Sequence, residues 1–350
     1  MPTTVQIAMQ STLGSKFCKA ASAGDVQAIR ELVLQAKAKG IDLSKTVAAD
    51  PSGRSAVFLA ASKGHQEPLS VMLEAGCSFS YPSKSGDTPL HMAAAAGSEG
   101  CALLLIRYGA DVNAPNGLGE VPIFLAACQG HVALIKALMA IEPQHLRPEL
   151  DIQRASDGCT PLHAAAKRGD AACASALLDH RADLDLEMQG STTALYVACI
   201  YNQHQVVATL VQRGANVQHR TATGQTPLFA AACSGCTAAI PLLLGARADP
   251  ESREQRGCTP LIAAAQKDHT AVVRALLLHG ADHTATLNDA TAAQHAVRTA
   301  CDACAAILFA HAATHPTVTS STRNDERKED SEAPCPPPAV DERVAGTGVS

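Results

Sequence analysis

The stretch that decides the fold is GDTPLHMAAAAGSEGCALLLIRYGADVNA, residues 86–114. It contains two short apolar segments, of which the first ends at Gly97 and the second at Gly109. We expect Thr88 to cap the first helix and Pro89 to hold its first position, where a missing N–H costs nothing. Each glycine is expected to end a helix, because glycine adopts the left-handed conformation with little strain. The stretch therefore predicts a pair of short helices.

The same pattern returns along the chain at a nearly constant interval. Its anchor is the Thr, or the residue in its place, at Ser55, Thr88, Val121, Thr160, Thr193, Thr226, Thr259 and Thr291. Successive anchors are separated by 33, 33, 39, 33, 33, 33 and 32 residues. A period of 33 with the motif TPLHxA is that of the ankyrin repeat. With its further copies GCTPLHAAAKRGD, GQTPLFAAACSG and GCTPLIAAAQKD, the chain resembles the ankyrin-repeat family.

This resemblance implies an all-α solenoid of about nine helix-turn-helix units with β-hairpin fingers. No single unit can bury its own apolar face, so the units must stack. We expect an N-terminal extension over 1–14, a repeat domain over 15–315 and a disordered, Pro-rich charged tail over 316–350. The units are expected to start near residues 14, 53, 86, 119, 158, 191, 224, 257 and 289.

The long interval after Val121 marks an insertion in the stretch 140–157. Pro143 and Pro148 favour an extended loop here, in place of a regular finger. Either a tolerated surface insertion or a protrusion specific to one partner accounts for it.

Composition excludes several classes of protein. The net charge is −5 and the pI is near 6.3, whereas nucleic-acid binders usually carry a basic excess. No run of about 18 apolar residues predicts membrane insertion, and the first residues do not resemble a signal peptide. The 13 cysteines follow the repeat rather than a disulfide framework. We therefore expect an intracellular monomer, in the cytoplasm or, alternatively, the nucleus.

Catalytic motifs are not found in the sequence, so we expect no enzyme activity, no cofactor and no metal site. His91 and His163 are the His of TPLH, which has a structural role in the family. Their place in other units is taken by Phe58, Phe124, Tyr196 and Phe229. Two C-x-x-C pairs, Cys233/Cys236 and Cys301/Cys304, leave a metal or redox role as the alternative to buried apolar packing.

Family members usually bind proteins on the concave face of the stack. The matching positions here flank the Gly that starts each repeat or follow the A-A pair of the first helix. They are Arg54, Lys63, Asp87, Glu120, Gln129, Lys167, Arg168, Tyr201, Gln225, Arg256, Lys267 and Arg298. From Lys167 onward this set carries only positive charge, which predicts a basic strip for an acidic protein segment, with Tyr201 as an aromatic anchor. The alternative is that these cations only keep the face solvated.

The resemblance therefore predicts a non-catalytic adaptor or scaffold that binds a partner protein. A regulatory or inhibitory subunit of an enzyme complex is one alternative. The substrate receptor of a ubiquitin ligase is another, although a receptor needs a C-terminal helical box rich in Leu and Cys, and the polar tail shows none.

Overall fold

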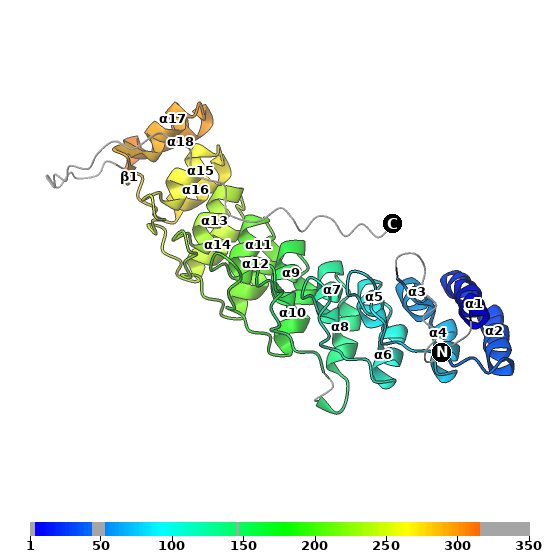
Figure 1. The fold of residues 1–350 in the computed structure, drawn as a ribbon. Coiled ribbons are helices and arrows are strands. Elements are labelled where there is room, and N and C mark those ends of the chain that lie inside the picture. The colour runs from blue at the N-terminus through cyan, green and yellow to red at the C-terminus, as the bar shows by residue number, and fades with distance from the viewer. Residues whose placement is uncertain (1–3, 44–52, 145–146, 316–350) are drawn as a thin grey trace. The chain divides into compact units, whose positions relative to one another are not determined.

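The computed structural model describes residues 4–43, 53–144 and 147–315 of the chain (Figure 1). The chain divides into two compact units, unit 1 over residues 1–183 and unit 2 over residues 184–350. The tail predicted to be disordered lies outside the described residues, as does most of the stretch between the first two repeats. No described helix is both long enough and apolar enough to cross a membrane.

Unit 1 contains five pairs of helices within the described residues. They are α1 (Thr4–Ala23), α2 (Val26–Ala38), α3 (Ala56–Lys63), α4 (Gln66–Glu74), α5 (Pro89–Ala95), α6 (Glu99–Arg107), α7 (Pro122–Gln129), α8 (Val132–Met139), α9 (Pro161–Arg168) and α10 (Ala171–Asp179).

Unit 2 adds four pairs in the part of the chain that the structure describes. They are α11 (Ala194–Ile200), α12 (His204–Gln212), α13 (Pro227–Ser234), α14 (Ala239–Gly245), α15 (Pro260–Gln266), α16 (Thr270–Leu278), α17 (Ala292–Arg298) and α18 (Asp302–Thr314). Strands β1 (Thr286–Leu287) and β2 (Ala290–Thr291) form an antiparallel ladder before α17. The predicted all-α solenoid of about nine repeats, each a pair of helices, is confirmed.

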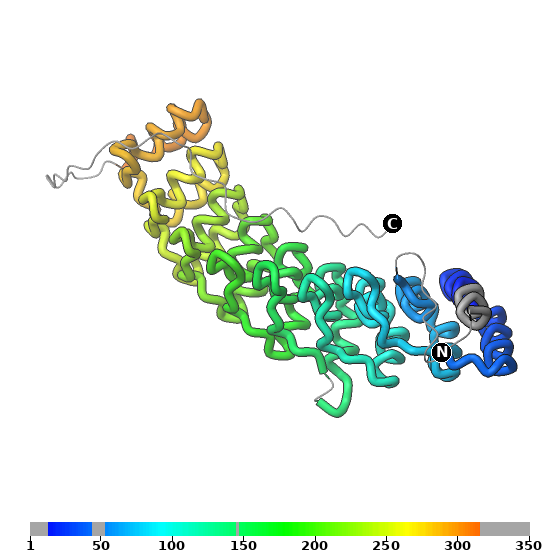
Figure 2. The backbone as a smooth tube through the Cα atoms, in the orientation of Figure 1, coloured from blue at the N-terminus to red at the C-terminus, as the bar shows by residue number. Residues whose placement is uncertain are grey.

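Each unit consists of two layers of helices. Within a unit, every odd-numbered helix packs on the next odd-numbered helix, and the even-numbered helices pack on one another in the same way (Figure 2). Alanines lie at the contacts: Ala60, Ala93, Ala94, Ala126 and Ala165 are fully buried in unit 1. Small side chains let the backbones of neighbouring helices approach closely, which explains a core rich in Ala and poor in aromatic residues.

The TPLH motif starts the odd-numbered helices in the predicted way. The hydroxyl of Ser55 accepts a hydrogen bond from the Phe58 amide at 3.1 Å, and Thr226 does the same for Phe229 at 3.3 Å. Val121 stands in the same place before α7 but has no side-chain cap. The start of α7 therefore lacks one hydrogen bond that its neighbours have.

The turns that precede the odd-numbered helices stack on one another by backbone hydrogen bonds. In unit 1 the Gly117 amide donates to the Ser85 carbonyl at 2.9 Å. In unit 2 the Ala222 amide donates to Gly190 at 2.9 Å, and the Gln255 amide donates to Thr223 at 3.0 Å. Gly86 has φ +85°, and a Cβ atom there would lie 2.5 Å from the Gly117 nitrogen. Glycine is needed at this position both for the turn and for the close approach of the next turn.

The prediction that the 140–157 stretch replaces a finger is wrong. The turn is closed by a bond from the Arg154 amide to the Cys159 carbonyl at 2.9 Å, the counterpart of the bond from Asn116 to Glu120 at 2.8 Å in the preceding repeat. The turn that ends at Cys159 is one residue longer than the turn that ends at Glu120. One of the six extra residues of this repeat therefore lies in the turn itself. The other five lie between α8 and Arg154, where Pro148 and Leu150 are buried.

Val121→Thr is expected to raise the free energy of unfolding by about 1 kcal/mol, because the Phe124 amide, which donates to the Val121 carbonyl at 2.9 Å, gains the side-chain acceptor that caps the neighbouring helices. The measurement is urea unfolding followed by circular dichroism. Ser55→Ala, which removes the equivalent bond from α3, serves as the control and is expected to lower the same quantity by a similar amount. Lower stability of Val121→Thr would show that a buried hydroxyl outweighs the cap at this position.

Candidate functional site

One side of each odd-numbered helix in unit 1 is left open to solvent. Residues four and eight positions after the N-cap lie one turn apart and so share a side of the helix. At position eight stand the exposed residues Lys63, Ala96, Gln129 and Arg168. At position four stand Leu59, Met92, Leu125 and Ala164, of which Met92 and Leu125 are half-buried. These eight residues define the open side of unit 1.

Four of the predicted site residues in unit 1 belong to this side or adjoin it. Lys63, Gln129 and Arg168 occupy position eight, and Lys167 is half-buried at position seven of α9. The Arg168 Nη1 atom donates to the Cys128 carbonyl at 3.3 Å, which holds the guanidinium across the end of α7. The nearby Asp170 caps α10 by accepting the Cys173 amide at 2.9 Å. The end of α9 therefore carries two cations near Asp170, whose carboxylate is already engaged in capping α10.

Unit 2 places its predicted residues at equivalent positions. Tyr201 and Lys267 stand at position eight, Arg298 at position seven and Arg256 in the turn before α15. The three cations are exposed, and Tyr201 is half-buried.

Two of the predicted site residues are buried, and for these the prediction is wrong. Glu120 is 6% exposed and Gln225 is 3% exposed. Both directly precede the N-cap, where the side chain lies between successive turns rather than on the surface. Gln225 accepts a hydrogen bond from the Tyr196 hydroxyl, and Glu120 accepts one from Arg154. Asp87 and Arg54 occupy the same position and are half-buried.

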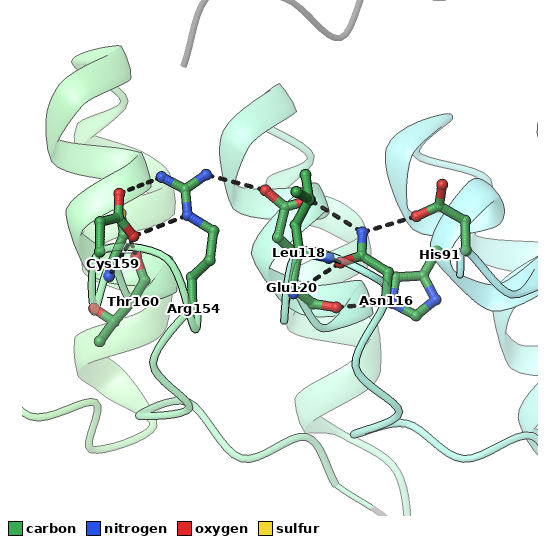
Figure 3. Close-up of polar contacts among 9 residues, drawn as sticks. His91, Asn116, Leu118, Glu120, Arg154, Cys159 and Thr160 are labelled. Atoms are coloured by element: carbon green, nitrogen blue, oxygen red, sulfur yellow. Dashed lines mark hydrogen bonds and ion pairs between the residues drawn. The ribbon is translucent and has the colours of Figure 1, made fainter. Parts of the chain in front are cut away.

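Glu120 belongs to a chain of polar contacts that links three consecutive turns of unit 1 (Figure 3). The Asn116 amide nitrogen Nδ2 donates to Asp87 Oδ1 at 2.8 Å and to Glu120 Oε2 at 3.1 Å. The Arg154 Nη1 atom donates to Glu120 Oε1 at 3.1 Å, and its Nε atom donates to Asp157 Oδ1 at 2.9 Å. Every buried charge in this chain thus has a charged or hydrogen-bonded partner, as burial requires.

The pKa values in this chain of contacts follow from its geometry. The Arg154 pKa is raised, mainly by its hydrogen bond to Asp157 and also by the one to Glu120, against the effect of burial. For Asp157, burial alone acts to raise the pKa, but the bonds from Arg154 and the Cys159 amide together hold it below the usual value. The guanidinium also lies 5.2 Å from the centre of the Phe124 ring, a cation–π distance. The pair of Arg154 and Asp157 therefore stays charged near neutral pH.

The same contacts order an exposed apolar tip. Asn116 Oδ1 accepts the Leu118 amide at 2.9 Å and the Glu120 amide at 2.9 Å, so the turn is held by its own side chain. Leu118 at this tip is 52% exposed (Figure 3). The sequence prediction had not included it.

The histidines of TPLH have the structural role expected of them. His91 Nδ1 accepts the Thr88 amide at 3.1 Å, and Nε2 donates to the Glu120 carbonyl at 2.9 Å. Burial lowers the His91 pKa, although the Glu120 carbonyl and the carboxylates of Asp87 and Glu120 oppose this. A neutral ring with its proton on Nε2 fits both bonds. His91 thus joins its own turn to the next one.

The cysteines give no support to a metal or redox site. No cysteine in the described part of the chain forms a disulfide, and Cys236, Cys301 and Cys304 are buried. Burial raises the pKa of Cys304 to about 11, so its thiol stays protonated and unreactive at neutral pH. Within residues 4–43, 53–144 and 147–315, no group of three or more His, Cys, Asp or Glu side chains could hold a metal ion.

Arg154→Met is expected to lower the free energy of unfolding by about 3 kcal/mol, because it leaves the Glu120 carboxylate buried without its charged partner. The measurement is urea unfolding of the full chain. The double variant Arg154→Met/Glu120→Gln removes that charge as well and is expected to recover more than half of the loss. Equal losses in the single and double variants would contradict the role assigned to the ion pair.

The sequence also matches known proteins. The family described as ankyrin repeats (3 copies) matches residues 17–116, 123–221, 185–254 and 228–320. The chain is 47% identical over 73 residues to Ankyrin repeat and SOCS box protein 11 of Danio rerio, which is 21% of this chain and 25% of that protein. It is 39% identical over 89 residues to the Homo sapiens protein of the same name, 25% of each chain.

A shorter match joins the chain to Ankyrin repeat and KH domain-containing protein mask of Drosophila melanogaster, 54% identical over 43 residues. That match covers 12% of this chain and 1% of the relative. The chain therefore matches about a quarter of the length of its SOCS box relatives and far less of the third. The matched segments are two or three repeats long or shorter, whereas the family match extends over most of the described residues. Together with the helix pairs and the 33-residue period, it shows that the chain belongs to the ankyrin-repeat family.

Proposed function

We propose that this chain is a non-catalytic adaptor or scaffold that binds a partner protein on the open sides of its odd-numbered helices. Ankyrin repeats indicate protein–protein interaction. The observation that carries the proposal is the open side of unit 1, where a row of exposed residues stands on helices whose other sides are buried.

The rigidity of this surface lowers the entropic cost of binding. The odd-numbered helices are fixed by caps, by alanine packing and by turns bonded to one another, so the surface exists before a partner arrives. Little conformational entropy is then lost on association. The same rigidity lets side chains at position eight vary without disturbing the stack, which is why the fold alone does not name the partner.

Charge supports an acidic partner segment. On unit 1 the cations are Lys63, Lys167 and Arg168, and on unit 2 they are Arg256, Lys267 and Arg298. Each set attracts and orients acidic residues even though the whole chain carries −5. Glu120 and Gln225 have no part in this surface, because both are buried and hydrogen-bonded to Arg154 and Tyr196, respectively.

One specific observation favours a second function, that of a substrate receptor in a ubiquitin ligase. Two relatives are named ankyrin repeat and SOCS box proteins, although the matches cover about a quarter of each. If the chain is instead a regulatory or inhibitory subunit of an enzyme complex, a catalytic activity should co-purify with it.

The test is affinity capture from the cells in which the chain occurs, with the retained proteins identified by mass spectrometry. Lys167→Glu/Arg168→Glu in unit 1 and Lys267→Glu in unit 2 are compared separately with the wild type. We expect at least one variant to lose a partner that the wild type retains, because the charge that attracts the partner has been reversed. Wild-type circular dichroism is required of every variant.

A matched control reverses two exposed cations of the even-numbered layer, Arg107→Glu/Lys136→Glu, and should retain the partner. If the control loses the partner while the two site variants keep it, binding lies on the even-numbered layer and the proposed surface is wrong. Recovery of ligase core subunits with the chain would favour the receptor function.

A further inference from the structure

The open side of unit 1 is apolar along its centre. Position four carries Leu59, Met92 and Leu125 on three consecutive odd-numbered helices, α3, α5 and α7. The same position holds Ala164 in α9, and Val197, Ala230 and Ala263 in unit 2, all of them smaller and buried. In α17 it holds His295, which is large but buried, and Leu59 of α3 is buried as well. Among the described residues, only unit 1 has long apolar side chains at this position that are half-buried rather than buried, namely Met92 and Leu125.

Packing gives these residues no structural reason to be large. Alanine at the same position in α13 and α15 is fully buried and leaves the helices packed in the same way. A long apolar side chain is stabilised only by the part of its surface that is buried, and the part that stays in water can be buried by a partner.

Charged residues stand at the two ends of this apolar row. Position eight is Lys63 on α3 and Arg168 on α9, while the uncharged Ala96 and Gln129 lie between them on α5 and α7. Lys167 adds a second cation at the α9 end. The row is therefore apolar in the middle and basic at both ends, with no carboxylate at position four or eight of these four helices.

We infer that unit 1 binds an extended protein segment with apolar side chains in its middle and acidic residues at both ends. This rests on the proposed function and names the chemistry of the partner. Neighbouring packed helices lie about 10 Å apart, so Lys63 and Arg168 are separated by about 30 Å. A polyproline-II segment rises about 3.1 Å per residue and repeats every three residues, about 9 Å. Every third side chain of a segment of about ten residues then meets the next helix of the row.

The test selects random 12-residue peptides, displayed on phage, against the full chain. We expect enriched peptides to carry large apolar residues three apart with Asp or Glu toward both ends. An enriched peptide is then measured by fluorescence anisotropy. Met92→Ser/Leu125→Ser is expected to weaken its binding about tenfold or more, because the apolar contacts are lost. Leu34→Ser is the control, since Leu34 is 66% exposed on α2 in the even-numbered layer, and it should leave binding unchanged.

A charge exchange tests the ends of the row without touching its apolar centre. Lys63→Glu/Arg168→Glu is expected to lose the acidic peptide and to bind a version of it with Lys in place of Asp and Glu. If the serine double variant does not show wild-type circular dichroism, this charge-exchange variant provides the test of the inference.

Failure of this inference and failure of the proposed function give different results. Enrichment of peptides without the pattern, no enrichment, or binding that neither set of substitutions alters would overturn the inference. If affinity capture still retains a partner through the proposed surface in that case, the adaptor function stands. If capture also retains nothing, both are wrong.

Discussion

The stack depends on the side chain at the third position of the odd-numbered helices α3 to α15. This residue is buried in each of them, and the position is filled by Phe58, His91, Phe124, His163, Tyr196, Phe229 or Ile262. In α17, the last helix of this layer, it is the exposed Gln294. Where the buried residue is polar, it also bonds forward: His91 donates to the Glu120 carbonyl and Tyr196 to the Gln225 side chain. Each repeat thus completes the core of its neighbour, which makes stacking obligatory for folding.

The polar chain from Asp87 to Asp157 extends the same constraint to the turns. It fixes the Leu118 tip and spans a turn that is one residue longer than its neighbours. The insertion is tolerated because five of the six extra residues precede Arg154 and the hydrogen bond that closes the turn still forms. In a stack fixed in this way, the side chains on the open side can vary without disturbing the packing.

Much of this could be predicted from the sequence, because the 33-residue period and the TPLH motif act locally. Thr88 and Pro89 start a helix by capping and by fixed φ whatever surrounds them. The exposure of Lys63, Gln129 and Arg168 follows from helix periodicity. Glu120 and Gln225 were misplaced because burial of the residue before the cap depends on the next turn. Cys159 and Cys258 at that position were a usable signal, since cysteine prefers burial.

The insertion was misread for a similar reason: a loop rich in Pro predicts irregular backbone but not where the regular turn resumes. Met92 and Leu125 could not be identified as surface residues from the sequence, because an apolar residue on an amphipathic helix usually lies in the core. Only the comparison with Ala164 and its counterparts, together with observed exposure, separates them from the core.

The central claim is that a partner lies on the open side of the odd-numbered helices in unit 1. Site-specific photo-crosslinking tests it most directly, with benzoylphenylalanine placed at Gln129 on α7 or at Lys136 on α8 of the same repeat. Both positions are exposed, and they lie in different layers. We expect a partner protein to be crosslinked to the probe at position 129 and not to the probe at position 136. Attachment from position 136 alone would contradict it.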